Sequence, residues 1–104
     1  MIDPAKISGI NDFEKLTEQL DEFNSRDLYK VTENGKAFLV VNKNTFELRT
    51  DDKLGKLLIE KYESVMQSRY FGRGGLEIVS SANQLKKDEL EDLVRLSYNL
   101  SKNL

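Results

Sequence analysis

Residues 28–49, LYKVTENGKAFLVVNKNTFELR, decide the fold that we predict for this chain. Two polar interruptions, Asn34-Gly35 and Lys43-Asn44, divide the stretch into three segments. Asn-Gly is the strongest short hairpin signal, because a type I′ turn needs positive φ at both central residues. The stretch therefore predicts three consecutive antiparallel strands, over 28–33, 36–42 and 45–49.

The middle strand is the most apolar of the three. Its run from Ala37 to Val41 contains no polar residue, which is typical of a central strand covered on both faces or nearly so. In the third strand Phe46 and Leu48 alternate with polar residues, so one face of that strand is expected to be wet. Together these patterns indicate a sheet with residues 36–42 at its centre.

A first helix is expected before the strands. Asn11 followed by Glu14 has the spacing of a capping box. Apolar residues then recur at three- and four-residue spacings, as on one face of a helix; they are Phe13, Leu16, Leu20 and Phe23. We expect this helix to end at Asn24-Ser25, and residues 1–9 to form a lead-in to it.

A second helix is expected after the third strand. Thr50, Asp51 and Asp52 supply an N-cap and acidic groups for its positive end. Gly55 inside the helix costs about 1 kcal/mol relative to alanine, and a close approach to the sheet would explain it. The buried face of this helix is expected to carry Leu54, Leu57, Leu58 and Tyr62.

The last third of the chain predicts a strand and a helix. Residues 65–71 fit either an edge strand or an extended loop, residues 72–75 a flexible turn, and residues 76–80 the last strand. A closing helix is expected over about 87–102, with Ser97 filling a gap in its apolar stripe. That stripe consists of Leu90, Leu93, Val94 and Leu100.

The predicted order of elements is α-β-β-β-α-(β)-β-α. Strands joined by tight hairpins imply an antiparallel sheet, here of about four to five strands, with the helices packed on one face. The length of 104 residues is typical of a single domain. We therefore expect residues 1–104 to form one α+β domain.

The composition excludes several kinds of functional site. The chain has no cysteine and no histidine, so thiolate nucleophiles, disulfides and histidine bases or ligands are absent. No pair of carboxylates is spaced in a way that demands acid–base work, and neither a cofactor nor a metal is expected. Because no leader and no membrane-spanning run is visible, we expect a cytoplasmic protein without a membrane partner. Because histidine and cysteine are missing, we also expect no enzyme activity.

Charge is unevenly distributed along the chain. Residues 1–35 contain eight acidic and four basic side chains, residues 36–87 ten basic and six acidic ones, and residues 88–104 four acidic and two basic ones. The middle of the chain is therefore basic, although the net charge is −2. A basic segment is expected of a surface that binds an anionic polymer such as DNA.

The segment 69–75, RYFGRGG, has two alternative interpretations. As a binding loop, it would pair its two arginines with phosphates and lay its aromatic rings against sugar or base. As an ordinary long hairpin, it would place Phe71 in the core and leave both arginines solvated. Its spacing does not match a phosphate-binding P-loop, since no Gly-Lys-Ser or Gly-Lys-Thr follows.

Several of these pieces together resemble one known family. A lysine-led apolar strand (35–41) is followed by a strand ending in Leu48-Arg49, by Leu57-Leu58 and by residues 62–65, YESV; a loop with a cation at Arg73 then precedes the last strand. The closing helix carries ELEDLVRLSY at 89–98, whose Leu-Val-x-x-Ser-Tyr ending is the most recognisable piece. Over about residues 28–102 this order resembles the YjbR/MmcQ family of small bacterial proteins.

The resemblance implies an α+β fold related to frataxin-like and secretion-chaperone-like domains. It also implies a double-wing mode of DNA binding, in which the sheet and hairpins lie against the duplex backbone. We expect weak, salt-sensitive binding to double-stranded DNA through Lys36, Lys43, Arg49, Arg69 and Arg73. The alternative is a protein-interaction module, which would bind a protein partner or a second copy of itself through the uncovered sheet face that includes Tyr29, Val31 or Phe46.

Overall fold

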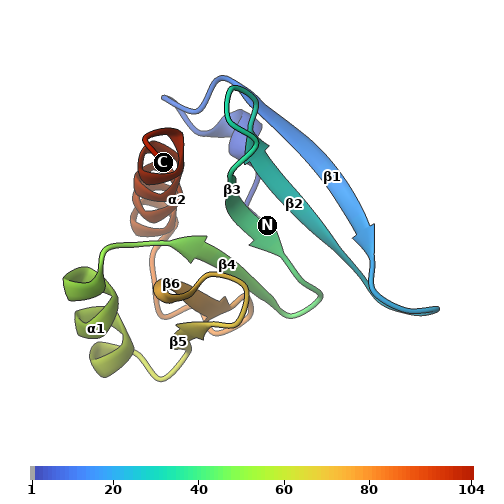
Figure 1. Cartoon of the computed structure of the whole chain (residues 1–104). Helices are drawn as coiled ribbons and strands as arrows, with labels where there is room; N and C mark the ends of the chain where they lie inside the picture. The colour runs from blue at the N-terminus through green and yellow to red at the C-terminus, as the bar shows by residue number, and fades with distance from the viewer. Residues whose placement is uncertain (1) are drawn as a thin grey trace.

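The computed structural model describes residues 2–104, which form an α+β fold with one six-stranded antiparallel sheet (Figure 1). The strand order across the sheet is β1-β2-β3-β4-β6-β5. The strands are β1 (Phe13–Gln19), β2 (Ser25–Val31), β3 (Ala37–Val41), β4 (Thr45–Arg49), β5 (Val65–Ser68) and β6 (Gly72–Val79). The helices are α1 (Asp52–Lys61) and α2 (Lys87–Lys102), and a 3₁₀ turn, η1, covers Pro4–Lys6. The α+β class is confirmed, but the sheet has more strands than the four to five expected.

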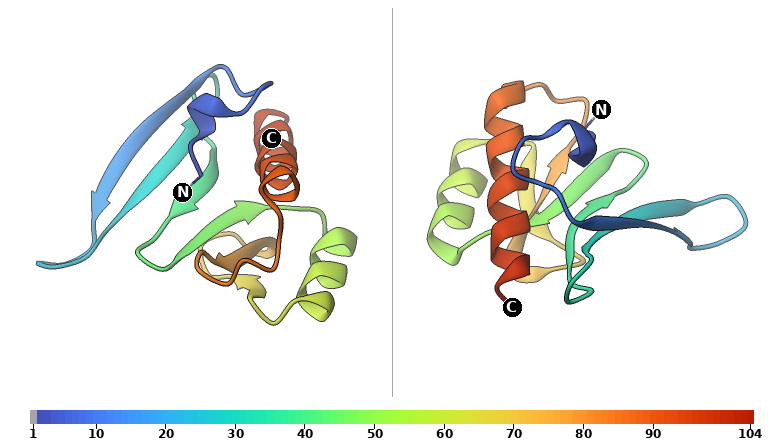
Figure 2. Two further views of the ribbon diagram at one scale, coloured as in Figure 1. Left: turned by 180° about the vertical axis from the view of Figure 1, so that it is seen from behind. Right: turned by 90° about the horizontal axis from the view of Figure 1, so that it is seen from above.

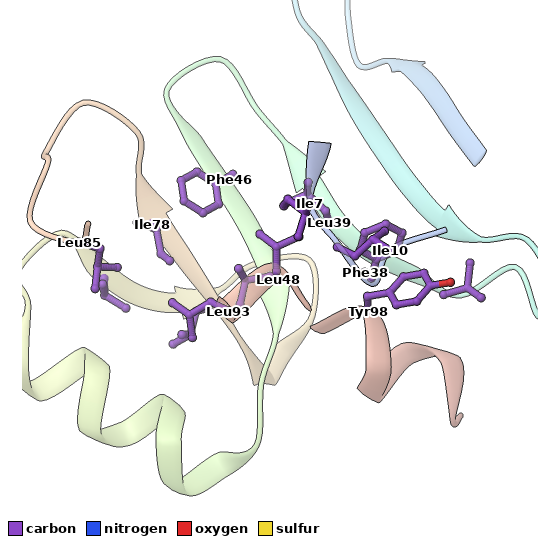
Figure 3. Packing of buried hydrophobic residues seen from close by; sticks show 14 residues of the cluster. Ile7, Ile10, Phe38, Leu39, Phe46, Leu48, Ile78, Leu85, Leu93 and Tyr98 are labelled. Atoms are coloured by element: carbon purple, nitrogen blue, oxygen red, sulfur yellow. The ribbon is translucent and has the colours of Figure 1, made fainter. Parts of the chain in front are cut away.

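Both α-helices cover the same face of the sheet (Figure 2). α2 packs mainly across β3 and β4, and α1 packs against β5 and β6. The core lies between this covered face and the helices, where Leu93 and Tyr98 of α2 join the strand residues Phe38, Leu48 and Ile78 (Figure 3). No helix among residues 2–104 combines the length and the apolarity that crossing a bilayer requires.

The first predicted helix, over about 11–23, is wrong, because residues 13–19 form the strand β1. This strand pairs along its whole length with β2. Phe13 joins an aromatic cluster, with its ring centroid 5.8 Å from that of Tyr29 and 6.1 Å from that of Phe38. Cross-strand pairing and ring contacts outweigh the local helical spacing, since tertiary contacts routinely override helix propensity.

The turn between β2 and β3 is not the type I′ turn that Asn34-Gly35 predicts. Gly35 has a φ of 70°, whereas Asn34 keeps a negative φ. The longer loop is closed by hydrogen bonds from Val31 N–H to Lys36 O at 2.9 Å and from Gly35 N–H to Val31 O at 2.8 Å. Asn34 instead donates from its side chain to the backbone oxygen of Ser101 in α2, at 2.9 Å. This contact with a distant helix accounts for the different turn and for the earlier end of β2.

β3 is a central strand, as predicted, and its residues from Ala37 to Val40 are buried. A bulge interrupts its pairing with β2, because Tyr29 lies opposite Leu39 while Lys30 lies opposite Ala37. Phe38 is therefore the extra residue, and a bulge allows two successive side chains to face the same partner. Phe38 and Leu39 both join the core for this reason.

α2 inserts two serines where β3 and β4 no longer pair directly. The hydroxyl of Ser97 accepts a hydrogen bond from the backbone N–H of Arg49 at 2.7 Å and donates to the backbone oxygen of Phe38 at 2.6 Å. The hydroxyl of Ser101 donates to the backbone oxygen of Ala37 at 3.0 Å. These side chains satisfy strand groups that would otherwise be buried without partners.

Residues 72–75 form the first half of β6, so the predicted flexible turn is wrong. The turn lies earlier, at residues 69–71. Gly75 is buried, and a Cβ atom there would lie 2.5 Å from Cβ of Phe71 and 2.8 Å from the backbone oxygen of Leu48. Glycine is required inside this strand because the 69–71 turn folds back over it.

The second and last predicted helices correspond to α1 and α2. Asp51 caps α1, with its Oδ1 accepting a hydrogen bond from Leu54 N–H at 2.8 Å. Gly55 is buried, and a Cβ atom there would lie 3.0 Å from Cγ2 of Thr50, so a close contact does explain this glycine. Leu57, however, is 57% exposed and does not belong to the buried face.

Candidate functional site on the uncovered sheet face

The sheet face turned away from α1 and α2, here called the outer face, carries buried acidic residues. The strand register places Leu28, Val40, Glu47 and Glu77 in one row across β2, β3, β4 and β6. Glu47 and Glu77 are only 2% and 1% exposed. Because glutamate is almost never fully buried without partners, this pair marks the outer face as the candidate site.

Glu47 is held by neutral hydrogen-bond donors. Its Oε1 accepts from Ser68 Oγ and from the backbone N–H of Tyr70, both at 2.9 Å. Its Oε2 accepts from Asn42 Nδ2 at 2.8 Å. Within residues 2–104 no ion pair includes Glu47, so these hydrogen bonds satisfy its buried oxygens.

Glu77 has a cation partner. Arg69 donates to it twice, from Nε at 3.0 Å and from Nη2 at 2.7 Å, and Thr45 Oγ1 donates at 2.7 Å. The hydrogen bond from Arg69 holds the pKa of Glu77 below its ordinary value, although burial acts in the opposite direction. The same bond raises the pKa of Arg69. The two-bond geometry is the one that a guanidinium and a carboxylate form most strongly.

The 69–71 turn is tied to the outer face by its backbone. Besides the bond from Tyr70 to Glu47, the N–H of Phe71 donates to Ser68 Oγ at 2.8 Å. Ser68 Oγ in turn donates to Glu47. The two buried carboxylates therefore position the turn that lies over them.

Two arginines flank the aromatic pair of this turn. The rings of Tyr70 and Phe71 meet edge to face with centroids 4.9 Å apart. The guanidinium carbon of Arg26, on β2, lies 5.1 Å from the Tyr70 centroid, and that of Arg49, on β4, lies 4.7 Å from the Phe71 centroid. These are cation–π distances, so the turn connects strands that are not neighbours in the sheet.

The five basic residues predicted to bind DNA lie in separate places. Lys36 and Lys43 flank opposite ends of β3. Arg73 lies 3.7 Å from the carboxylate of Asp52, at the start of α1. Arg49 and Arg69 both contact the region of the 69–71 turn, Arg49 against the ring of Phe71 and Arg69 on the carboxylate of Glu77.

The interaction surface predicted at Tyr29, Val31 or Phe46 lies on the wrong face. Val31 is 1% exposed and Phe46 is 6% exposed, and both belong to the core. Tyr29 lies opposite Leu39, whose side chain is also in the core. Side chains alternate between faces along a strand, and the sequence alone does not show which set the helices cover.

The β1–β2 hairpin is a second exposed feature, and it projects beyond both helices (Figures 1 and 2). Leu16 and Leu20 are each 50% exposed, and Phe23 at its tip is 87% exposed. A groove of about 310 Å³ beside the tip is lined in part by Phe23, Val41 and Lys43. Apolar side chains gathered on a projecting element are a common mark of a contact surface.

Glu47 and Glu77 are not predicted as site residues by the sequence patterns. Each glutamate stands between two apolar residues, in FEL at 46–48 and in LEI at 76–78. Such alternation normally indicates a solvated position, and the burial arises only when the 69–71 turn folds over both strands. The one available signal was that the same apolar-Glu-apolar pattern occurs in both predicted strands.

The chemical capacity of the outer face is limited. Both carboxylates are buried, and both already accept hydrogen bonds from donors within the protein. Within residues 2–104 no group of three or more acidic, histidine or cysteine side chains could hold a metal ion. The arrangement is suited to positioning the 69–71 turn and the arginines beside it.

Comparisons of the chain with protein-family models, with curated proteins and with solved structures found no match.

Proposed function

We propose that this protein is a non-catalytic binding domain that acts through protein–protein contact, with the open edge of β1 as its contact surface. The observation that carries the proposal is the position of β1, which has a neighbouring strand on one side only. An open edge offers a row of free backbone donors and acceptors to another strand. The exposed leucines of β1 add apolar surface beside this row.

Alternate residues of β1 face the open edge. Thr32 N–H donates to Asp12 O, and Leu20 N–H donates to Asn24 O. In an antiparallel pair these bonds recur at every second residue, so the even-numbered residues of β1 pair with β2. The odd-numbered residues direct their N–H and C=O groups outward; they are Phe13, Lys15, Thr17 and Gln19.

The partner that we infer is a second copy of this chain. Two antiparallel β1 strands related by a two-fold axis at Leu16 overlap over the whole of 13–19, with about eight backbone hydrogen bonds. In this register Leu16 packs against the partner's Leu16 and leaves water. Glu14 faces the partner's Glu18, and each of these carboxylates has a cation opposite it on its own β2, Lys30 for Glu14 and Arg26 for Glu18.

A substitution at Thr17 tests the proposal. Thr17→Pro removes an N–H group that faces the open edge and none that pairs with β2, and proline is tolerated at such edge positions. Light scattering is expected to give the mass of a dimer for the wild-type protein and of a monomer for the variant, with Thr17→Ser as the matched control that remains dimeric. A wild-type protein that is monomeric at every concentration, or a well-folded Thr17→Pro variant that still dimerises, contradicts the proposal.

Binding to double-stranded DNA is a second proposal, which follows from the resemblance to the YjbR/MmcQ family. It is supported by Lys36, Lys43 and Arg49, which form no ion pair among the described residues. Because only three of the five predicted contacts are without an ion pair within residues 2–104, the binding would be weak and would disappear as salt is raised. A titration of a labelled short duplex at low and at physiological salt tests this, and absence of binding at low salt contradicts it. The family resemblance and a cytoplasmic location likewise stay predictions.

A further inference from the structure

Arg49 differs from the other arginines in having no carboxylate partner. Arg26, Arg69, Arg73 and Arg95 each lie within 4.0 Å of one, at 2.8, 2.7, 3.7 and 2.7 Å. Among the described residues no ion pair includes Arg49, although its side chain is half-buried. Burial lowers the pKa of Arg49 because it disfavours the charged form. An anion beside the guanidinium would offset that cost.

The guanidinium of Arg49 is fixed in position. Its Nε donates to the backbone oxygen of Ala37 at 3.1 Å and to the hydroxyl of Ser101 at 2.9 Å. Its planar group lies against the ring of Phe71. The two terminal nitrogens make no hydrogen bond to the described residues and are not buried, so an oriented pair of N–H donors faces solvent. This fork matches the oxygens of a phosphate or a carboxylate.

The C-terminal carbonyls of α2 do not account for this arginine. Asn34 Nδ2 donates to the backbone oxygen of Ser101 at 2.9 Å, and Asn103 Nδ2 donates to that of Asn99 at 2.8 Å. Side-chain amides therefore cap the end of the helix, while Arg49 contacts the Ser101 hydroxyl. A capping role would need contact with the carbonyls themselves.

Two lysines are sequence neighbours of the residues that hold the Nε of Arg49. Lys36 precedes Ala37 and Lys102 follows Ser101, the two residues that hold the Nε of Arg49. Both lysines are exposed and neither forms an ion pair among the described residues. Three cations complement a phosphate, with a charge near −2, better than a single carboxylate.

We propose that Arg49, Lys36 and Lys102 form a binding site for a phosphate group, carried by a small molecule or by a nucleic-acid backbone. Arg49 supplies two parallel hydrogen bonds, and the lysines supply charge that attracts the ligand. The site lies at the end of α2, whereas the dimer contact uses the edge strand β1 (Figure 1). The two proposals therefore succeed or fail separately.

Inorganic phosphate is the first probe, compared with chloride at equal ionic strength. Phosphate is expected to raise the melting temperature of the wild-type protein, because it binds the folded chain alone. Arg49→Lys keeps the charge but loses the fork, and we expect roughly tenfold weaker phosphate binding. The matched control Arg73→Lys, at an ion-paired arginine, is expected to bind as the wild type does.

A second variant keeps the test decisive if Arg49→Lys folds poorly. Lys36→Gln combined with Lys102→Gln changes only exposed side chains and is expected to weaken phosphate binding several-fold. A short DNA duplex, titrated in parallel, separates the sources of the phosphate group. Binding of both ligands assigns the nucleic-acid backbone, and binding of inorganic phosphate alone assigns a small phosphate. Equal effects of phosphate and chloride, or phosphate binding unchanged in both variants, overturn the proposal.

Discussion

Glu47 and Glu77 lie directly opposite each other on β4 and β6 with both side chains buried, yet only Glu77 has a cation partner. Like charges opposite each other in a sheet are destabilising. The pair persists because six hydrogen bonds from five residues converge on it, and the most exposed of these residues is Arg69. The stability of the outer face should therefore respond to pH and to loss of this arginine.

We expect the free energy of unfolding to decrease as the pH falls below the ordinary glutamate pKa of 4.5. The folded chain holds the pKa of Glu77 below that value, mainly through the hydrogen bond from Arg69. The stabilisation is complete above the unfolded pKa and is lost as the pH falls through the folded pKa. Urea unfolding at a series of acidic pH values should show a shallower loss for Glu77→Gln than for the wild type. Equal pH slopes in the two proteins would contradict this assignment.

Arg69→Gln is expected to lower the melting temperature, because Glu77 then remains buried without its cation. Arg73→Gln is the matched control, since its ion pair with Asp52 is long, at 3.7 Å, and both side chains are exposed. Surface pairs of this kind contribute little. Thermal unfolding at neutral pH should separate the two variants, and equal melting temperatures would show that Arg69 is not needed by Glu77.

Ser97→Ala is expected to destabilise the protein by about 2–3 kcal/mol, because it leaves the backbone N–H of Arg49 and the backbone oxygen of Phe38 without partners. The serine is fully buried between the two strands. Urea unfolding measures the difference, with the exposed Ser81→Ala as the control that should change little. If Ser97→Ala leaves the free energy of unfolding almost unchanged, β3 and β4 must pair directly where Ser97 now lies between them, which would contradict the prediction.

Gly75→Ala and Gly74→Ala are expected to differ sharply, although they are neighbours in β6. A Cβ atom at Gly75 would meet Phe71 at 2.5 Å, whereas at Gly74 the nearest atom is 4.0 Å away. Overpacking costs about 1–3 kcal/mol or more, and it should displace the 69–71 turn. Urea unfolding of both variants tests this. If the two variants are equally stable, the 69–71 turn does not lie against Gly75, and the prediction is wrong.

The elements predicted well are those whose signal is local. β4 and α2 have the predicted bounds. The alternation in 45–49 nevertheless predicted a wet face for β4, and this is wrong, because Glu47 is buried as well as Phe46 and Leu48. β3 was recognised as central from its apolar run. In each case the residues that indicate the type and the bounds of the element are neighbours in sequence.

β1 and the 72–75 segment were mispredicted because their structure depends on distant residues. Phe13 and Leu16 have helical spacing, and only the partner strand β2 shows that they belong to a strand. The glycines at 72–75 resemble a turn, and only the approach of Phe71 shows that Gly75 belongs in a strand. Local pattern cannot distinguish these cases.

The candidate site was harder to predict, because it depends on pairings between segments. From the sequence, Arg69 and Arg73 are interpreted as free cations. Only the fold brings Glu77 and Asp52 within ion-pair distance of them. Arg49 was proposed as a contact for DNA phosphates, but the reason that it remains unpaired lies in its position between two strands and the end of α2. Charge counts along a sequence do not include this geometry.

Residue-resolved amide hydrogen exchange of β1 tests the central claim most directly. In a monomer the even-numbered amides that bond to β2 should be protected, while those of Lys15, Thr17 and Gln19 exchange freely. We predict that these outward-facing amides become protected as the protein concentration rises, because the partner's β1 covers them. Outward amides that exchange freely at every concentration would contradict the pairing of two β1 edges.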